Sequence, residues 1–473
     1  VGLWVGAGSR DEGPGAEGST HFLEHLLFKG TAKRSAKQIA QRIDYLGGDF
    51  NAATAKQYTC YYGHVFEQDL PDALELLTDM VTGARLNEED MEMERGVILE
   101  ELAMYNDDAS DVAHENITSM IFGDHPLGRP VGGTRESVTN LRNSSLLEHY
   151  SQMYRPSELV VTAAGAVDHE AFCEQVMENL DAGGWDLSGP AQHSGRRTAA
   201  DIDYSEPETR FLERPVEQSA VILAMPGVDL FDERRPALFA MNAILGGGTS
   251  SRLFQKIREE RGLAYSTYSF PSSFPEGGIF GMYAGCTIEN SEAVAELLGE
   301  CLDELARDGV SEEEMESAYR RIRADIVFGN ERIGAHMNRL GNAELIRGAL
   351  VSQAESLRKA RAVTAAEDRR RAAQEAAYRF ADDIWMHAGS RPGECSSLFT
   401  QWKLAGRMTQ EKIWQRMLLV FPTRDSRSML AYLQKELSGS AEQLAAERLI
   451  QLYDTPERLL EILPAGNESA QMA

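Results

Sequence analysis

The feature that most constrains this chain is the pentapeptide His21-Phe22-Leu23-Glu24-His25, near its amino end. In an α-helix, residues three and four positions apart lie on one face, so His21, Glu24 and His25 would point the same way. Two imidazoles on one face can bind a single Zn²⁺, and the carboxylate between them can accept a proton from water. The alternative is a pair of surface histidines on an amphipathic helix. A third ligand elsewhere in the chain would decide between the two.

The composition is that of a soluble globular protein with several domains. A length of 473 residues predicts two to four domains, and no apolar stretch is long enough to predict a membrane-spanning helix. The five cysteines include no CxxC pair, so neither a disulfide framework nor a cysteine zinc site is expected. A reducing compartment such as the bacterial cytoplasm fits best. Since the chain begins at Val1 with no basic-then-apolar leader, any targeting segment is expected to be absent or removed, which leaves a mitochondrial or exported form open.

The charge balance excludes some partners. With 74 acidic and 47 basic residues, the formal net charge is −27. Such a surface repels nucleic acid and anionic membranes, so neither is expected as a partner. An acidic cleft would concentrate basic peptides. The alternative is that the acidity only maintains solubility.

The apolar pattern predicts alternating strands and helices in the first part of the chain. Strands are expected at 1–8, 49–66 (as a pair) and 159–165. Helices are expected at 19–28, 31–46, 70–83, from 87 onward and at 168–180. Ser19 and Thr20 would cap the first helix.

The helix expected from residue 87 carries candidates for a third metal ligand. Glu94 and Glu101 are seven residues, or two turns, apart and share a face, whereas Glu100 points about 100° away. Helix geometry alone does not choose among them, because most glutamates in so acidic a helix face solvent.

A weak internal repeat predicts two related lobes. The sequence LNEEDME at 86–92 corresponds to VSEEEME at 310–316, and each opens a long helix. The positions matching the two histidines and the glutamate are about Arg235, Leu238 and Phe239, so the second lobe would hold no metal. We expect a zinc-binding lobe at 1–183 and a second lobe without ligands at 206–378. A linker at 184–205 would join them, and a helical tail of unassigned role would follow at 379–473.

The second lobe has a glycine-rich stretch at 245–248, followed by a helical pattern. Such a loop could cradle a phosphate, which makes a nucleotide-binding protein a third hypothesis. No Gly-Lys-Ser/Thr follows, so a P-loop is not expected. A tight turn with Thr249 or Ser250 as the helix cap explains the stretch more simply. The region 329–377 is expected to be helical.

Seven segments together resemble the inverted-zincin peptidases of the pitrilysin and insulin-degrading-enzyme group. They are GSRDE at 8–12, HFLEHLLFKGT at 21–31, GGDFNAATAKQYTCYY at 47–62, ERGVILEEL at 94–102, HPLGRPVGGT at 125–134, YRPSELVVTAAG at 154–165 and LGGGTSSRLFQKIREERGLAYS at 245–266. The resemblance covers roughly residues 1–378. It is closest to smaller members such as the mitochondrial processing peptidase β subunit and its bacterial homologues.

The resemblance implies a fold and a metal site. The fold would be α+β, with two homologous α/β lobes, each an antiparallel sheet with helices packed on it, forming a clam-shell peptidase. The family has a strand before the one at Val1, which this chain is expected to lack. His21, His25 and Glu101 would bind one Zn²⁺ per chain, Glu24 would be the base, and Glu94 would support the ligands.

The resemblance also implies how substrate is held. Arg258 and Tyr265 would reach over the active site from the second lobe, and Asn51, Ala52 and Thr54 lie on a strand that pairs with substrate. The expected function is a zinc metalloendopeptidase that hydrolyses extended peptides or unfolded proteins, with a preference for basic segments. A homodimer, or a heterodimer with a homologous subunit, is expected. The alternative is a catalytically inactive scaffold or partner subunit of a heteromeric processing peptidase.

Overall fold

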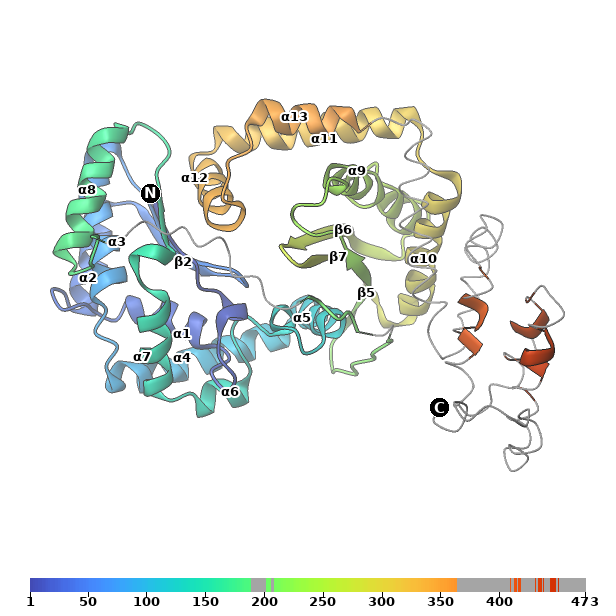
Figure 1. Ribbon diagram of the computed structural model, residues 1–473, viewed down its shortest axis with the longest axis horizontal. Helices are drawn as coiled ribbons and strands as arrows, with labels where there is room; N and C mark the ends of the chain where they lie inside the picture. Colours follow the sequence, from blue (N-terminus) through green and yellow to red (C-terminus); the bar gives the residue numbers. More distant parts are fainter. Residues whose placement is uncertain are drawn as a thin grey trace, which may run out of the picture. The chain divides into compact units, whose positions relative to one another are not determined.

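The computed structural model describes residues 1–188, 201–205 and 208–363, with short stretches between 409 and 450. The described chain contains helices and two antiparallel sheets, and this confirms the predicted α+β class (Figure 1). Residues 1–205, 213–295 and 313–363 form one compact unit. The helical tail expected at 379–473 lies largely outside the described residues.

The first sheet has four strands in the order β2-β3-β1-β4, and each neighbouring pair is antiparallel. The strands are β1 (Gly2–Val5), β2 (Asp49–Thr54), β3 (Thr59–His64) and β4 (Leu159–Thr162). All four were predicted, although β1 and β4 are shorter than expected. Because β2 is at the edge of this sheet, the backbone groups on its outer side have no partner among the described strands.

In the described residues 1–188, eight α-helices lie between and after these strands in the sequence. They are α1 (Ser19–Leu27), α2 (Ala36–Leu46), α3 (Leu70–Gly83), α4 (Glu88–Asp107), α5 (Ala109–Phe122), α6 (Arg135–Asn140), α7 (Asn143–Met153) and α8 (His169–Ala182). Figure 1 shows α3 and α8 side by side at the edge of this lobe, and the two are in contact. Short 3-10 turns connect the elements at Ser9–Asp11, Glu67–Asp69, Pro126–Gly128 and Pro156–Glu158.

Strand β1 shows how the two faces of this sheet are buried. Leu3 and Val5 pack into the main core with the apolar side of α1, and both are at most 1% exposed. Trp4 points to the other face, where it packs with Met337 of α12 (Ile333–Asn342). A Cβ on Gly341 would lie 2.2 Å from the Trp4 ring, so the helix can approach this closely only with glycine there. Helix α12, distant in sequence, therefore covers the second face of the first sheet.

The second sheet has three strands in the order β5-β7-β6, again antiparallel. They are β5 (Gln218–Gly227), β6 (Ala264–Phe274) and β7 (Gly277–Thr287). Its neighbours in sequence are α9 (Arg235–Leu245), which contacts β6, and a π-helical turn at Phe254–Glu259. The remaining elements are a 3-10 turn at Ile288–Asn290, α10 (Ser291–Asp308), α11 (Glu312–Glu331), a π-helical turn at Ala343–Arg347 and α13 (Gln353–Ala362).

Helix α5 joins the first part of the compact unit to the second sheet. It contacts β5 and β7, and the imidazole of His114 stacks on the Tyr268 ring with centroids 6.0 Å apart. Arg10 and Glu276 form an almost fully buried ion pair between the 3-10 turn after β1 and the turn between β6 and β7. The ion pair is buried and the ring contact is partly buried, and both join the elements on which their residues lie.

Four details of the prediction were wrong. The first helix has Gly18 as its N-cap, and Ser19 and Thr20 are already helical. The second helix begins only at Ala36, where Ser35 and Gln38 form a capping box. The hydroxyl of Ser251, rather than Thr249 or Ser250, accepts a bond from the helix that follows the glycines. The helical region expected at 329–377 is broken into α12, a π-helical turn and α13, and its end lies beyond the described residues.

Candidate metal centre

Helix α1 places His21, Glu24 and His25 on one partly exposed stripe. The opposite stripe carries Phe22 and Leu23, which are fully buried in the main core. Burial of that apolar stripe fixes the rotation of the helix and therefore the direction of the polar stripe. The two imidazole rings lie edge to face, with their centroids 4.7 Å apart.

Helix α4 packs against α1 and brings Glu101 to the histidines. The Oε2 atom of Glu101 lies 3.2 Å from Nε2 of His25 and 3.7 Å from Nε2 of His21. Tetrahedral ligands about 2.0–2.1 Å from zinc are separated by about 3.3 Å, so these spacings are close to what zinc requires. In the part of the chain that the structure describes, this trio is the one cluster of three or more potential metal ligands.

An unsatisfied atom of the trio also fits a metal ion. Oε2 of Glu101, the oxygen that faces both histidines, is buried and receives no hydrogen bond from a described residue. Buried polar atoms are normally paired, so a cation between the three side chains would explain the arrangement. Burial, followed by the nearby His25, lowers the pKa of His21. That shift favours the neutral imidazole, which is the form that binds metals.

Glu94 lies directly behind His25. Its Oε1 atom is 3.0 Å from Nδ1 of His25, and its Oε2 atom is 2.5 Å from Nζ of Lys29. The glutamate side chain is only 4% exposed. A carboxylate on Nδ1 holds the proton there, leaves Nε2 free to bind a metal and fixes the ring orientation.

Strand β2 contacts the carboxylate between the two histidines. Thr54, at the end of that strand, donates a hydrogen bond to Oε2 of Glu24. Asn51 and Ala52 lie on the same edge strand, where Asn51 is exposed and its Oδ1 accepts from the backbone N–H of Ala52 at 2.8 Å. The three residues expected to bind substrate therefore lie on one edge strand, whose end contacts Glu24.

Sequence reasoning missed the residue that caps α1. Glu12 is buried, and its carboxylate accepts hydrogen bonds of 2.8 Å from the backbone N–H groups of Gly18 and Thr20. Arg129 donates to the Glu12 carbonyl, and Thr20 Oγ1 is 3.0 Å from Nε2 of His149. Burial raises the pKa of Glu12 to about 8. The GSRDE segment could be recognised in the sequence, but no sequence pattern predicted that its glutamate would bind the start of the helix.

The structure brings Arg258 and Tyr265 to each other. The Arg258 guanidinium lies 5.0 Å from the centre of the Tyr265 ring, and Tyr265 is 78% exposed. In the described chain, neither side chain forms a hydrogen bond or ion pair with His21, Glu24 or Glu101. Their action over the metal centre therefore stays a prediction.

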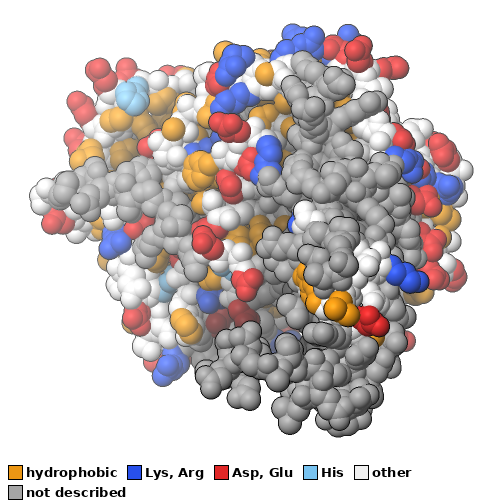
Figure 2. All heavy atoms as spheres, turned by 45° about the vertical axis from the view of Figure 1, so that its right-hand side comes forward, with side chains coloured by type: hydrophobic (Ala, Val, Ile, Leu, Met, Phe, Trp, Pro, Cys, Tyr) orange, Lys and Arg blue, Asp and Glu red, His pale blue; other side chains and the backbone are white. Residues whose placement is uncertain are grey.

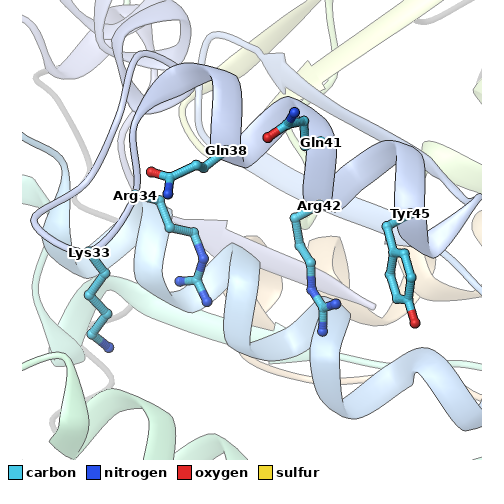
Figure 3. Close-up of a pocket in the computed structure, with 6 residues that line it drawn as sticks. All are labelled: Lys33, Arg34, Gln38, Gln41, Arg42 and Tyr45. Atoms are coloured by element: carbon cyan, nitrogen blue, oxygen red, sulfur yellow. The ribbon is translucent and has the colours of Figure 1, made fainter.

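A concave region lies at α2, and none of the residues that line it is a candidate metal ligand. It is a hollow of about 430 Å³ lined by Lys33, Arg34, Gln38, Gln41, Arg42 and Tyr45 (Figure 3). Arg34 is paired with Glu75 at 2.7 Å and with Asp79 at 2.6 Å, and Arg42 with Asp72 at 2.7 Å. Because carboxylates of the protein already neutralise these arginines, the hollow is a poor site for an anion.

On the face drawn in Figure 2, the charged side chains of the described residues are mixed rather than separated. Figure 2 shows acidic and basic side chains interspersed on one face of the molecule. None of the described helices is both long and apolar enough to cross a membrane.

Comparison with known families identifies two matching regions. Residues 1–135 match the family described as Insulinase (Peptidase family M16), and residues 140–322 match the Peptidase M16 inactive domain. In the second region, Arg235, Leu238 and Phe239 lie on α9, outside the one ligand cluster of the described residues.

Individual relatives are zinc proteases by name. An uncharacterized zinc protease of Streptomyces coelicolor is 45% identical over 77% of this chain and 79% of its own length. One from Bacillus subtilis is 34% identical over 74% of this chain and 83% of its own length.

The fold is shared with a solved protease of Helicobacter pylori. That structure is 20% identical in sequence and superposes with a TM-score of 0.72. The match covers 79% of this chain and 89% of the other. At that identity the likeness concerns the fold alone. Together with the sequence matches, it confirms the resemblance drawn from the motifs: the chain belongs to the M16 family of peptidases.

Proposed function

We propose that this protein is a zinc-dependent endopeptidase that cleaves extended peptides. The observation that carries the proposal is the convergence of Nε2 of His21, Nε2 of His25 and Oε2 of Glu101, with Glu24 on the same helical stripe. A site with two imidazoles and one carboxylate leaves a coordination position free, as catalytic zinc sites do.

The side chains around the ligands have separate roles in the proposed reaction. When bound, zinc would lower the pKa of water toward 7 and polarise the scissile carbonyl. Glu24 would take the proton from the attacking water and later pass it to the leaving amine. The hydrogen bond from Thr54 would orient the Glu24 carboxylate for both transfers.

The second lobe and the edge strand would position the substrate. Arg258 and Tyr265 would donate to the carbonyl oxygen as it gains negative charge. A peptide would pair with the outer edge of β2 through its backbone, which selects for extended chains and unfolded proteins. The net charge of −27 would attract basic peptides at long range.

The proposal extends to the assembly and the location of the protein. We propose a dimer, formed with a second copy or with a homologous subunit. The four cysteines in the described residues are all free, which supports a reducing compartment such as the bacterial cytoplasm.

The test is the Glu24→Gln variant, compared with Glu100→Gln as a matched control on the exposed side of α4. We expect Glu24→Gln to retain about one zinc per chain and to lose chelator-sensitive cleavage of an unfolded protein, because only the proton acceptor is removed. Glu100→Gln should keep both. Unchanged turnover in Glu24→Gln would refute the assigned base. A wild-type protein with neither zinc nor cleavage would instead support the inactive subunit.

A further inference from the structure

A cationic cavity lies next to the end of β2. It has a volume of about 630 Å³ and is lined by four basic side chains: Lys56, Arg235, Arg339 and Arg347. Among the described residues that line it, none is acidic. In a chain with 27 more acidic than basic residues, such a concentration of positive charge is not expected from composition.

Two of the four cations form no ion pair with a described residue. The Nε atom of Arg235 is buried and has no hydrogen bond to a described residue, although its guanidinium lies 4.9 Å from the centre of the Phe239 ring. Arg347 is half-buried and forms no hydrogen bond or ion pair within the described chain, and burial lowers its pKa. Removing a guanidinium from water without a counter-charge is unfavourable, so a bound anion would stabilise both.

The other two cations are already held. Arg339 donates to Oδ1 of Asn330 at 3.1 Å and to the carbonyl of Val351 at 2.6 Å. Lys56 donates to the carbonyl of Arg129 at 2.7 Å, and burial lowers its pKa to about 8. These bonds fix the two side chains at the cavity wall, where they add positive charge without closing off the unpaired arginines.

The cavity is within reach of a peptide that pairs with β2. Thr54 is the last residue of β2 and contacts Glu24, and the next two residues, Ala55 and Lys56, line the cavity. Two residues of extended chain span at most about 7 Å. A substrate advancing about 3.3 Å per residue along β2 would thus enter the cavity a few residues from the scissile bond.

We propose that this cavity is a substrate subsite that binds a carboxylate of the peptide, either an acidic side chain or the free carboxyl terminus. Arg235 and Arg347 bind the carboxylate, since a guanidinium matches both oxygens of that group. The inference rests on the proposed peptidase function and adds a local selectivity to it. Long-range attraction of basic peptides is compatible with one acidic contact at this position.

Direct binding tests the subsite independently of cleavage. The probe is a short fluorescein-labelled peptide with one Glu and a free carboxyl terminus, measured by fluorescence anisotropy on the full chain. Its analogues carry Gln in place of Glu, or an amidated terminus. We expect at least one analogue to bind about tenfold more weakly than the parent, as for a lost charge-assisted hydrogen bond. The analogue that weakens identifies the source of the carboxylate.

Substitutions assign the effect to the cavity. Arg347→Gln and Arg235→Gln should each bind the parent peptide as weakly as the wild-type protein binds the weak analogue. The control is Arg320→Gln, which removes the same charge from an exposed site paired with Glu316 and should leave discrimination intact. Two independent arginines keep the test valid if one variant fails to fold.

Three outcomes overturn the subsite: both analogues bind like the parent, no peptide binds, or both arginine variants keep full discrimination. The peptidase function is tested separately: the wild-type chain should cleave the neutral analogue, and Glu24→Gln should not. An active peptidase without discrimination therefore refutes the subsite alone, and discrimination without cleavage refutes the peptidase alone.

Discussion

Replacing Glu94 tests whether the residue behind His25 sets the zinc affinity. Its carboxylate accepts a 3.0 Å hydrogen bond from Nδ1 of His25 and also pairs with Lys29. In Glu94→Ala the ring loses the partner that fixes its orientation and its proton. We therefore expect zinc to bind about 10–100-fold more weakly, which corresponds to about 1.4–2.7 kcal/mol.

The assay is competition for zinc against a chelator of known affinity, at neutral pH and fixed ionic strength. Glu94→Gln separates charge from geometry, because the amide oxygen can still accept from Nδ1 while the charge is removed. It should lose less affinity than Glu94→Ala. Lys29→Met is the matched control, since it removes the other partner of Glu94 and leaves its bond to His25 in place. Equal zinc affinity in Glu94→Ala and the wild-type protein would refute the role given to this carboxylate.

Three further predictions concern stability. Gly341→Ala should lower the free energy of unfolding by about 1–3 kcal/mol, because its Cβ would overlap the Trp4 ring. The control Gly299→Ala, which has open space around it, should not lower it, and denaturant titration of both variants measures the difference. Arg10→Met should cost about 3–5 kcal/mol because it breaks the buried ion pair with Glu276; a loss below about 1 kcal/mol by the same titration would contradict this. The Glu12 carboxyl has a folded-state pKa of about 8, above its ordinary value of 4.5, so its contribution to stability should be present below pH 4.5 and be lost as pH rises to 8. In Glu12→Gln, the free energy of unfolding should change with pH by less than in the wild-type protein, the difference being on the order of a few kcal/mol. Urea unfolding between pH 5 and pH 9 measures it; an unchanged pH dependence would exclude Glu12 as the cause.

Local patterns predicted the four strands of the first sheet and the helices α1, α2, α3, α4 and α8, but they did not predict α6 and α7. The helix at 70–83 and the start of the helix at Asn87 were predicted as observed, because Asn87 is a strong cap and the apolar spacing is regular. The helical spacing of His21, Glu24 and His25 was enough to predict their common face. Helix periodicity placed Glu94 and Glu101 on one face of α4, but only the contact with α1 distinguishes which of them reaches both histidines.

The second sheet could not be placed from the same kind of signal. In β7, ten of the eleven residues are buried, so the strand lacks the alternation that marks a half-exposed strand. Five of its residues are glycine or alanine, which have low strand propensity. Its position depends on pairing with β5 and β6, and those contacts are long-range in sequence.

The metal helix depends on contacts that no local pattern contains. A helix of nine residues is too short to be stable alone, and α1 has no side-chain cap of its own at Gly18. The backbone N–H groups of Gly18 and Thr20, at the start of this helix, donate hydrogen bonds to the side-chain carboxylate of Glu12. The backbone carbonyl of Glu12 in turn accepts a hydrogen bond from Arg129. Because Thr20 immediately precedes His21, we expect a movement of Glu12 to shift His21, the first of the proposed metal ligands. The geometry of the HxxEH motif therefore depends on a loop nine residues upstream of its first histidine as well as on the motif itself.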